Sequence, residues 1–220
     1  MNKLQERRRR IGMESVIRNK STRIPVCFCV DVGGKIGIRQ LEEQLNETLL
    51  TQIRSRLSLG VSVELSVIAF GDRAQCVRRY QLLRPEERVS LTMQESGKPA
   101  LKEALRLARR GIRELEVRYL QGGINYVEPA VFLFTGGTGR EMTEEERQQL
   151  AAAAGNLRIK VFSTDTEDSA LKQIAFQGRI SSLSDSRYEE IFRNIGQSME
   201  ELSASSFRAY RSLMESCTEW

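Results

Sequence analysis

The sequence predicts an α/β fold built on a mostly parallel sheet. Short apolar runs, typical of strands buried on both faces, alternate along the chain with stretches of helical periodicity. The chain has 220 residues, of which 40% are hydrophobic and 29% charged, a composition that suits one globular domain with a substantial core. Neither an internal repeat nor a second domain is evident from the sequence.

The first half of the chain predicts three strands and one helix. Residues 24–31 form an apolar run that ends in an acid, and a glycine-rich turn follows over 32–37. Apolar residues at four-residue spacing then predict a helix that ends at Gly60. Residues 61–70 and 74–83 predict two further strands, and the short turn between them favours antiparallel pairing.

The second half of the chain continues the alternation after a loop over residues 84–98. Thr143 and Glu146 have the spacing of a capping box, which marks the start of a helix. The expected elements are a helix from Pro99, a strand over 130–135, a helix from Thr143 to Gly155, a strand over 157–162, a short helix over 168–176, a weak strand near 179–180 and a helix over 185–216.

The positive charge is concentrated at the N-terminus. Residues 1–23 hold eight Lys or Arg and two Glu, whereas the rest of the chain holds 26 Lys or Arg and 27 Asp or Glu. The net charge of +5 therefore comes from the leading segment. We expect a flexible basic arm over 1–22, a domain over 23–205 and a helical tail over 206–220. The arm is the only candidate for nucleic-acid binding, and no aromatic residue interleaves with its arginines. Nucleic acid is therefore not the expected partner.

Several absences exclude classes of function. The chain has no histidine, which removes His-based triads, general bases and metal sites, and no G-x-S-x-G motif occurs. No apolar run is long enough to span a bilayer, and no secretory signal is present, so a membrane is not expected as a partner. Cys27 and Cys29 are too close for an ordinary zinc site and predict buried, reduced thiols, as in a cytoplasmic protein.

A set of motifs, in this order and spacing, resembles a known family. The motifs are Pro25-Val26-x-x-x-x-Asp31, the run 61–70, Gly97-x-x-Ala100-Leu101-x-x-Ala104-Leu105, the strand 131–135 and the segment 192–199. Over about residues 23–205 the chain is similar to von Willebrand factor A (vWA) domains of the TerY-like bacterial branch, which is associated with tellurium resistance. The resemblance implies a doubly wound, Rossmann-like, six-stranded sheet with one antiparallel edge strand and helices on both faces.

The resemblance also implies a metal-ion-dependent adhesion site, which this chain has mostly lost. In that family D-x-S-x-S after the first strand, a threonine before a central helix and an aspartate after the fourth strand hold Mg²⁺. A partner's acidic side chain completes the octahedron. Here the first motif reads Asp31-Val32-Gly33-Gly34-Lys35. Pro99 or Lys98 stands at the position of the family's threonine, and Gly136 at the position of its aspartate. One carboxylate is a poor Mg²⁺ site, so we predict no bound metal and no cofactor.

Lys35 suggests a replacement for the lost metal charge. We expect its ammonium, or that of Lys98, to pair with Asp31 and to attract a partner's carboxylate through a salt bridge. The alternative is that Lys35 is a solvated loop residue.

These observations predict a non-enzymatic protein-interaction module. Ligands of open α/β sheets bind where the winding direction reverses, and loops on a rigid scaffold usually carry binding. The predicted partner-binding residues are Asp31, Gly33, Gly34, Lys35, Lys98, Pro99, Gly136 and Gly137. The resemblance implies a bacterial cytoplasmic stress or signalling system in which such domains accompany a protein kinase and a phosphatase.

The alternative function is a nucleotide- or phosphate-binding α/β protein. Its glycine-rich loops, 32–37 and 136–139, would cradle phosphates with backbone N–H groups. Neither the Rossmann nor the P-loop spacing is met. Asp165 and Asp168 are the only other acids expected near this edge, and we interpret them as a polar loop with a helix cap.

Overall fold

The computed structural model describes residues 22–49, 61–83, 87–93, 99–139, 141–184 and 187–204. The predictions for the basic arm up to residue 21, for Lys98 and for the tail over 206–220 lie outside these ranges. Measured by length and hydropathy, none of the helices in the described ranges qualifies as a membrane span.

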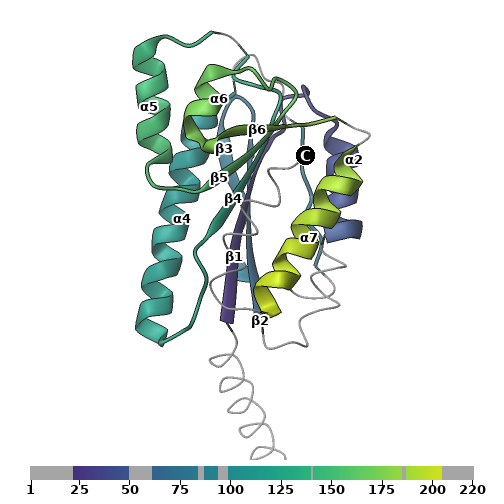
Figure 1. The fold of residues 1–220 in the computed structure, drawn as a ribbon, viewed down its shortest axis with the longest axis vertical. Helices are drawn as coiled ribbons and strands as arrows, with labels where there is room; N and C mark the ends of the chain where they lie inside the picture. Colours follow the sequence, from purple (N-terminus) through teal and green to yellow (C-terminus); the bar gives the residue numbers. More distant parts are fainter. Residues whose placement is uncertain are drawn as a thin grey trace, which may run out of the picture.

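The described chain folds into one six-stranded sheet between two layers of helices (Figure 1). The strands are β1 Thr22–Asp31, β2 Val61–Phe70, β3 Ala74–Leu82, β4 Ala130–Thr135, β5 Ile159–Ser163 and β6 Ala175–Ser182. The helices are α2 Ile38–Gln44, the π-helical turn η1 Leu45–Leu49, α4 Leu101–Gly122, α5 Glu144–Ala154, α6 Ser169–Ile174 and α7 Tyr188–Ala204.

The strand order is β3-β2-β1-β4-β5-β6, and only the β2–β3 pair is antiparallel. This confirms the predicted doubly wound sheet with one antiparallel edge strand. The turn of residues 71–73 is too short for a crossover, so β3 must return alongside β2.

Strand β1 is buried on both faces because its side chains alternate between two cores. Phe28 and its alternate neighbours face α2 and α7, where Phe132, Phe134 and Phe192 surround the Phe28 ring. Cys27 and Cys29 face α4, α5 and α6. Both are free, buried thiols, and a hydrogen bond with Cys27, together with burial, raises the pKa of Cys29 well above its usual value.

Two expected elements differ from the observed ones in form or extent. The first helix starts at Ile38 and widens into the π-helical η1 at Leu45, and the region where it was expected to end lies beyond the described residues. The weak strand near 179–180 is the eight-residue edge strand β6, which begins directly after α6. Its exposed face leaves little apolar pattern, and Gln177 and Gly178 have positive φ angles of 56° and 69°.

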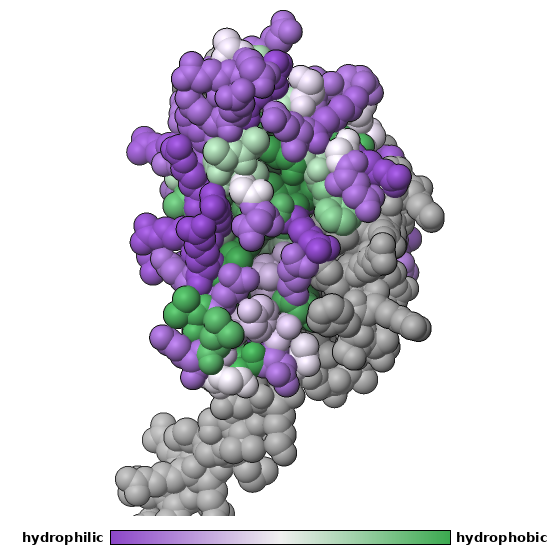
Figure 2. Space-filling view, turned by 60° about the vertical axis from the view of Figure 1, so that its left-hand side comes forward, coloured by the Kyte–Doolittle hydropathy of each residue, from purple (hydrophilic) through white to green (hydrophobic). Residues whose placement is uncertain are grey.

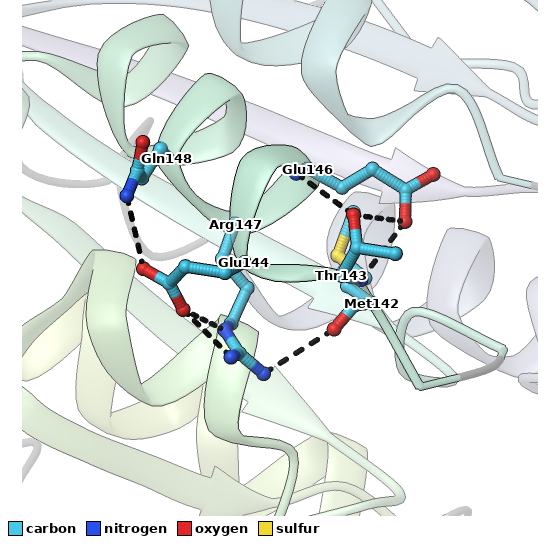
Figure 3. A network of polar contacts seen from close by, with 6 residues as sticks. All are labelled: Met142, Thr143, Glu144, Glu146, Arg147 and Gln148. Atoms are coloured by element: carbon cyan, nitrogen blue, oxygen red, sulfur yellow. Dashed lines mark hydrogen bonds and ion pairs between the residues drawn. The ribbon is translucent and has the colours of Figure 1, made fainter.

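The predicted capping box at the start of α5 is confirmed. The Thr143 hydroxyl accepts a hydrogen bond from the Glu146 N–H at 3.3 Å, and the Glu146 carboxylate accepts one from the Thr143 N–H at 3.0 Å (Figure 3). Arg147 adds an ion pair with Glu144 at 2.6 Å and a hydrogen bond to the Met142 carbonyl at 3.2 Å. The network provides hydrogen-bond partners for the first turn of α5. Helix α5 packs against α4.

We expect Thr143→Ala to lower the free energy of unfolding by about 1 kcal/mol, because the first turn of α5 loses its side-chain acceptor. Urea unfolding followed by circular dichroism measures this difference. Thr92→Ala, at an exposed loop threonine, serves as the control and should stay within about 0.5 kcal/mol of the wild type. Equal losses for the two variants would show that the capping box contributes nothing.

Candidate functional site

The candidate site lies where β1 and β4 end side by side. Val30 pairs with Phe134 in parallel register, so the next residues, Asp31 and Thr135, end their strands at the same edge of the sheet. The chain leaves β1 toward α2 on one face and β4 toward α5 on the other. This is the point of reversed winding at which open α/β sheets bind ligands.

The Asp31 carboxylate is buried and holds this edge together. The residue is 1% exposed. One carboxylate oxygen accepts a hydrogen bond from the Gly33 N–H at 2.9 Å. The other accepts bonds from the Thr135 hydroxyl at 3.0 Å and the Gly136 N–H at 3.3 Å. Three protein donors therefore compensate the buried charge, and they tie the loop after β1 to the loop after β4.

Sequence reasoning missed the role of Thr135. Besides donating to Asp31, its hydroxyl oxygen accepts a hydrogen bond from the Gly137 N–H at 3.2 Å. The available signal was a threonine at the end of an apolar run, aligned with an acid at the end of another. The signal can be used only when the register between β1 and β4 is known. The sequence does not show this register, because Asp31 and Thr135 are 104 positions apart in the chain.

The Lys35 side chain rests on two glycines of the opposite loop. A Cβ atom added at Gly136 would lie 2.3 Å from the Lys35 Cβ, and one added at Gly139 would lie 2.6 Å from the Lys35 Nζ. The Cβ atom added at Gly139 would also lie 3.7 Å from the Pro99 Cδ. The structure thus brings Lys35, Gly136 and Pro99 together as expected, and the absence of side chains at Gly136 and Gly139 creates the seat for the lysine.

The expected ion pair between Lys35 and Asp31 is not formed. Within the described residues Asp31 makes no salt bridge, and its oxygens bond to the three donors above. The Lys35 stem directs its ammonium toward Gly139, and the residue stays exposed, which avoids the cost of desolvating a second charge. Lys35 is therefore exposed to solvent, as in the alternative, while its stem lies against the opposite loop.

The other predicted glycines have distinct surroundings. Gly34 is exposed with φ of +84°, and an added Cβ would lie 3.7 Å from the terminal methyl of Met93, itself 59% exposed. Gly137 has φ of +100° and is buried against Asp165 and Asp168. Positive φ favours glycine at both positions.

Asp168 is the helix cap that the sequence indicated. One of its oxygens accepts hydrogen bonds from the N–H groups of Ala170 and Leu171, at 3.0 and 3.1 Å. The other accepts bonds from the N–H and hydroxyl of Thr138, at 2.9 and 2.7 Å. Asp168 therefore anchors the glycine loop to α6.

This arrangement disfavours phosphate binding by loop 136–139. The N–H groups of Gly136, Gly137 and Thr138 already donate to Asp31, Thr135 and Asp168, respectively. A phosphate would have to displace these internal acceptors, and it would meet the negative charge of Asp168.

The residues at this edge do not fit a Mg²⁺ ion of the adhesion-site type. Asp31 supplies one carboxylate, and the side-chain oxygen that contacts it, that of Thr135, already donates to it. Nowhere in the described ranges do three acidic or cysteine side chains gather in positions to hold a metal. An octahedral Mg²⁺ site requires more oxygen ligands than this edge presents.

Comparison with known proteins identifies the fold. No family model and no curated protein matches the sequence. Among solved structures, a von Willebrand factor type A protein from Catenulispora acidiphila superposes with a TM-score of 0.60 at 14% identity, over 82% of this chain and 43% of that one. The pilus adhesin SpaC of Lactobacillus rhamnosus GG gives 0.56 at 10% identity, over 83% and 31%.

A third similar structure carries a metal at its adhesion site. Proximal thread matrix protein 1 from the mussel byssus, described with a zinc-occupied MIDAS motif, gives a TM-score of 0.52 at 15% identity, over 82% of this chain and 46% of that one. The chain thus spans less than half the length of these proteins. At such identities the similarity establishes the vWA fold, as the sequence predicted, and the fold alone.

We expect Gly136→Ala to destabilise the protein by about 1–3 kcal/mol, because the new methyl group overlaps the Lys35 Cβ. Adding Lys35→Gly to this variant should recover most of the loss, whereas adding Lys35→Ala, which keeps the Cβ, should not. Urea unfolding of the single and double variants measures the coupling. Equal recovery by Lys35→Gly and Lys35→Ala would contradict direct contact between the two Cβ positions.

Proposed function

We propose that this chain is a metal-independent protein-interaction module of the vWA fold that recognises an acidic partner through the carboxyl edge of its sheet. The observation that carries the proposal is the exposed Lys35 side chain, seated on Gly136 and Gly139 above the buried Asp31. In the family that the sequence resembles, a metal at this edge binds a partner's carboxylate. Here the Lys35 ammonium offers a positive charge at the same edge.

The seat of Lys35 makes it a better recognition group than a free surface lysine. A long lysine side chain loses rotamer entropy when it binds, and its position against Gly136 and Gly139 already restricts it. Within the described residues Lys35 has no ion-pair partner, so its donors are available to a carboxylate. Gly34 and the exposed Met93 beside it would supply an apolar contact of the kind enriched at interfaces.

The proposed module has no catalytic role. Asp31, Thr135 and Asp168 lie at the edge where the winding reverses, and hydrogen bonds that hold the loops engage all three. The resemblance to TerY-like proteins supports a cytoplasmic stress or signalling system related to tellurium resistance. A protein kinase or phosphatase that accompanies such domains is the first partner to test.

We expect divalent metals to leave the thermal stability of the wild-type chain unchanged. A ligand at 100 times its dissociation constant adds about 2.7 kcal/mol to the folded state, a readable rise of the midpoint. Thermal unfolding in EDTA and then in Mg²⁺, Mn²⁺ or Ca²⁺, with Asp31→Ala as the reference, measures the effect. A metal-dependent rise in the wild type that Asp31→Ala abolishes would restore a metal-bridged mechanism.

We expect Lys35→Met to lose the partner while it keeps the fold, because the methionine retains the stem but not the charge. Proteins that co-purify with the tagged wild-type chain should be depleted with Lys35→Met and retained with Lys172→Met, which removes a lysine on α6. The unfolding free energy of Lys35→Met should stay within about 0.5 kcal/mol of the wild type, since the side chain is exposed. Unchanged co-purification would exclude Lys35 as the recognition group.

A further inference from the structure

A second feature lies away from the carboxyl edge, in a groove between the edge strand β3 and helix α4. The groove encloses about 510 Å³, and its floor is formed by Ile68, Tyr80, Leu107, Ala108 and Leu115. Gly111 leaves a gap in the middle of α4, where an added Cβ would meet the Tyr80 ring at 3.5 Å. The face on which α4 and α5 lie is otherwise largely hydrophilic, with hydrophobic side chains visible between the charged ones (Figure 2).

The rim of this groove is positively charged. Arg79, Arg110 and Arg118 line it, against one acid, Glu114. Arg110 pairs with Glu114 at 2.9 Å, and Arg118 pairs with the buried Glu64. Arg79 is exposed and forms no ion pair within the described residues. An apolar floor with an arginine rim selects an occupant that combines apolar and acidic side chains.

We propose that the occupant is the chain's own C-terminal segment, residues 205–220. Residues 205–220 hold two arginines, Arg208 and Arg211, and both lie in the part next to α7. The last nine residues, Ser-Leu-Met-Glu-Ser-Cys-Thr-Glu-Trp, contain three large apolar side chains, two glutamates and no basic residue. Leu213, Met214 and Trp220 match the apolar floor, and Glu215 and Glu219 match the arginine rim. The other terminal segment, residues 1–21, carries seven Lys or Arg against two Glu, so the same rim repels it.

The path of the chain permits this contact. Helix α7 ends at Ala204, at the end of the molecule where α4 also ends and β1 begins (Figure 1). The groove runs along the middle of α4, from Leu107 to Arg118. The remaining 16 residues reach about 50 Å when extended, whereas a six-stranded sheet is only about 24 Å across. The segment can thus pass from the α7 face round the β2–β3 edge to the α4 face.

The chain contains its own reporters for this contact. Cys76 lines the groove and is exposed, whereas Cys27 and Cys29 are buried. Cys217 lies in the proposed occupant. A thiol oxidant such as diamide takes two electrons and two protons from a neighbouring thiol pair and leaves a disulfide. We expect treatment of the dilute full-length chain, followed by digestion and mass spectrometry, to give an intrachain Cys76–Cys217 link as the main product.

Charge variants separate specific docking from chance collision. Arg79→Glu should lower the yield of that link by up to about fivefold, the upper limit expected for loss of an exposed ion pair. Glu215→Arg with Glu219→Arg in the Arg79→Glu background should restore it. Arg113→Glu, at an exposed arginine of α4 outside the groove, should change little. Equal yields for Arg79→Glu and Arg113→Glu would overturn the proposal.

The fluorescence of Trp220, the only tryptophan, gives an independent measurement. Its emission in the native chain should be blue-shifted relative to the chain unfolded in guanidinium, and Arg79→Glu should move it toward the unfolded value while circular dichroism stays unchanged. A solvent-exposed tryptophan in the native wild type would overturn the proposal. Interchain links as the main oxidation product would overturn it as well, since the groove would then bind a second copy.

Discussion

The burial of one carboxylate, that of Asp31, determines the geometry of the carboxyl edge. A buried ionised carboxylate is tolerated only when hydrogen-bond donors surround it, and here the donors come from Gly33, Thr135 and Gly136. These bonds require the loop after β1 and the loop after β4 to lie against each other. The same contact brings Lys35 over Gly136, so the exposed part of the site depends on the buried part.

The sequence predicted the fold well where the signals are local or the strands are buried. The runs that became β1 and β4 are continuously apolar because both faces of these strands are covered, and the capping box at Thr143 lies within four residues. Edge strand β6 gave a weak signal because half of its residues are exposed and only two are buried. Its length depends on pairing with β5, which periodicity does not show.

The candidate site was less predictable, since its contacts join distant parts of the chain. The sequence indicated the loops that meet where β1 and β4 end, and Asp168 proved to be a helix cap as expected. The bond between Asp31 and Thr135 depends on strand register, and the seat of Lys35 depends on side chains that are missing at Gly136 and Gly139. The predicted ion pair between Lys35 and Asp31 rested on their charges alone. It is not formed because backbone N–H groups and a hydroxyl already compensate the carboxylate.

Gly136 and Lys35 form one structural unit. A side chain at position 136 would occupy the space of the lysine stem, so the observed position of Lys35 requires a glycine there. The exposure of Lys35 limits the strength of the proposed site. An exposed ion pair contributes about 0–1 kcal/mol. A partner that binds through Lys35 must therefore gain most of its affinity from the surrounding surface, including Gly34 and Met93, over an interface on the order of 1,000 Å² or more.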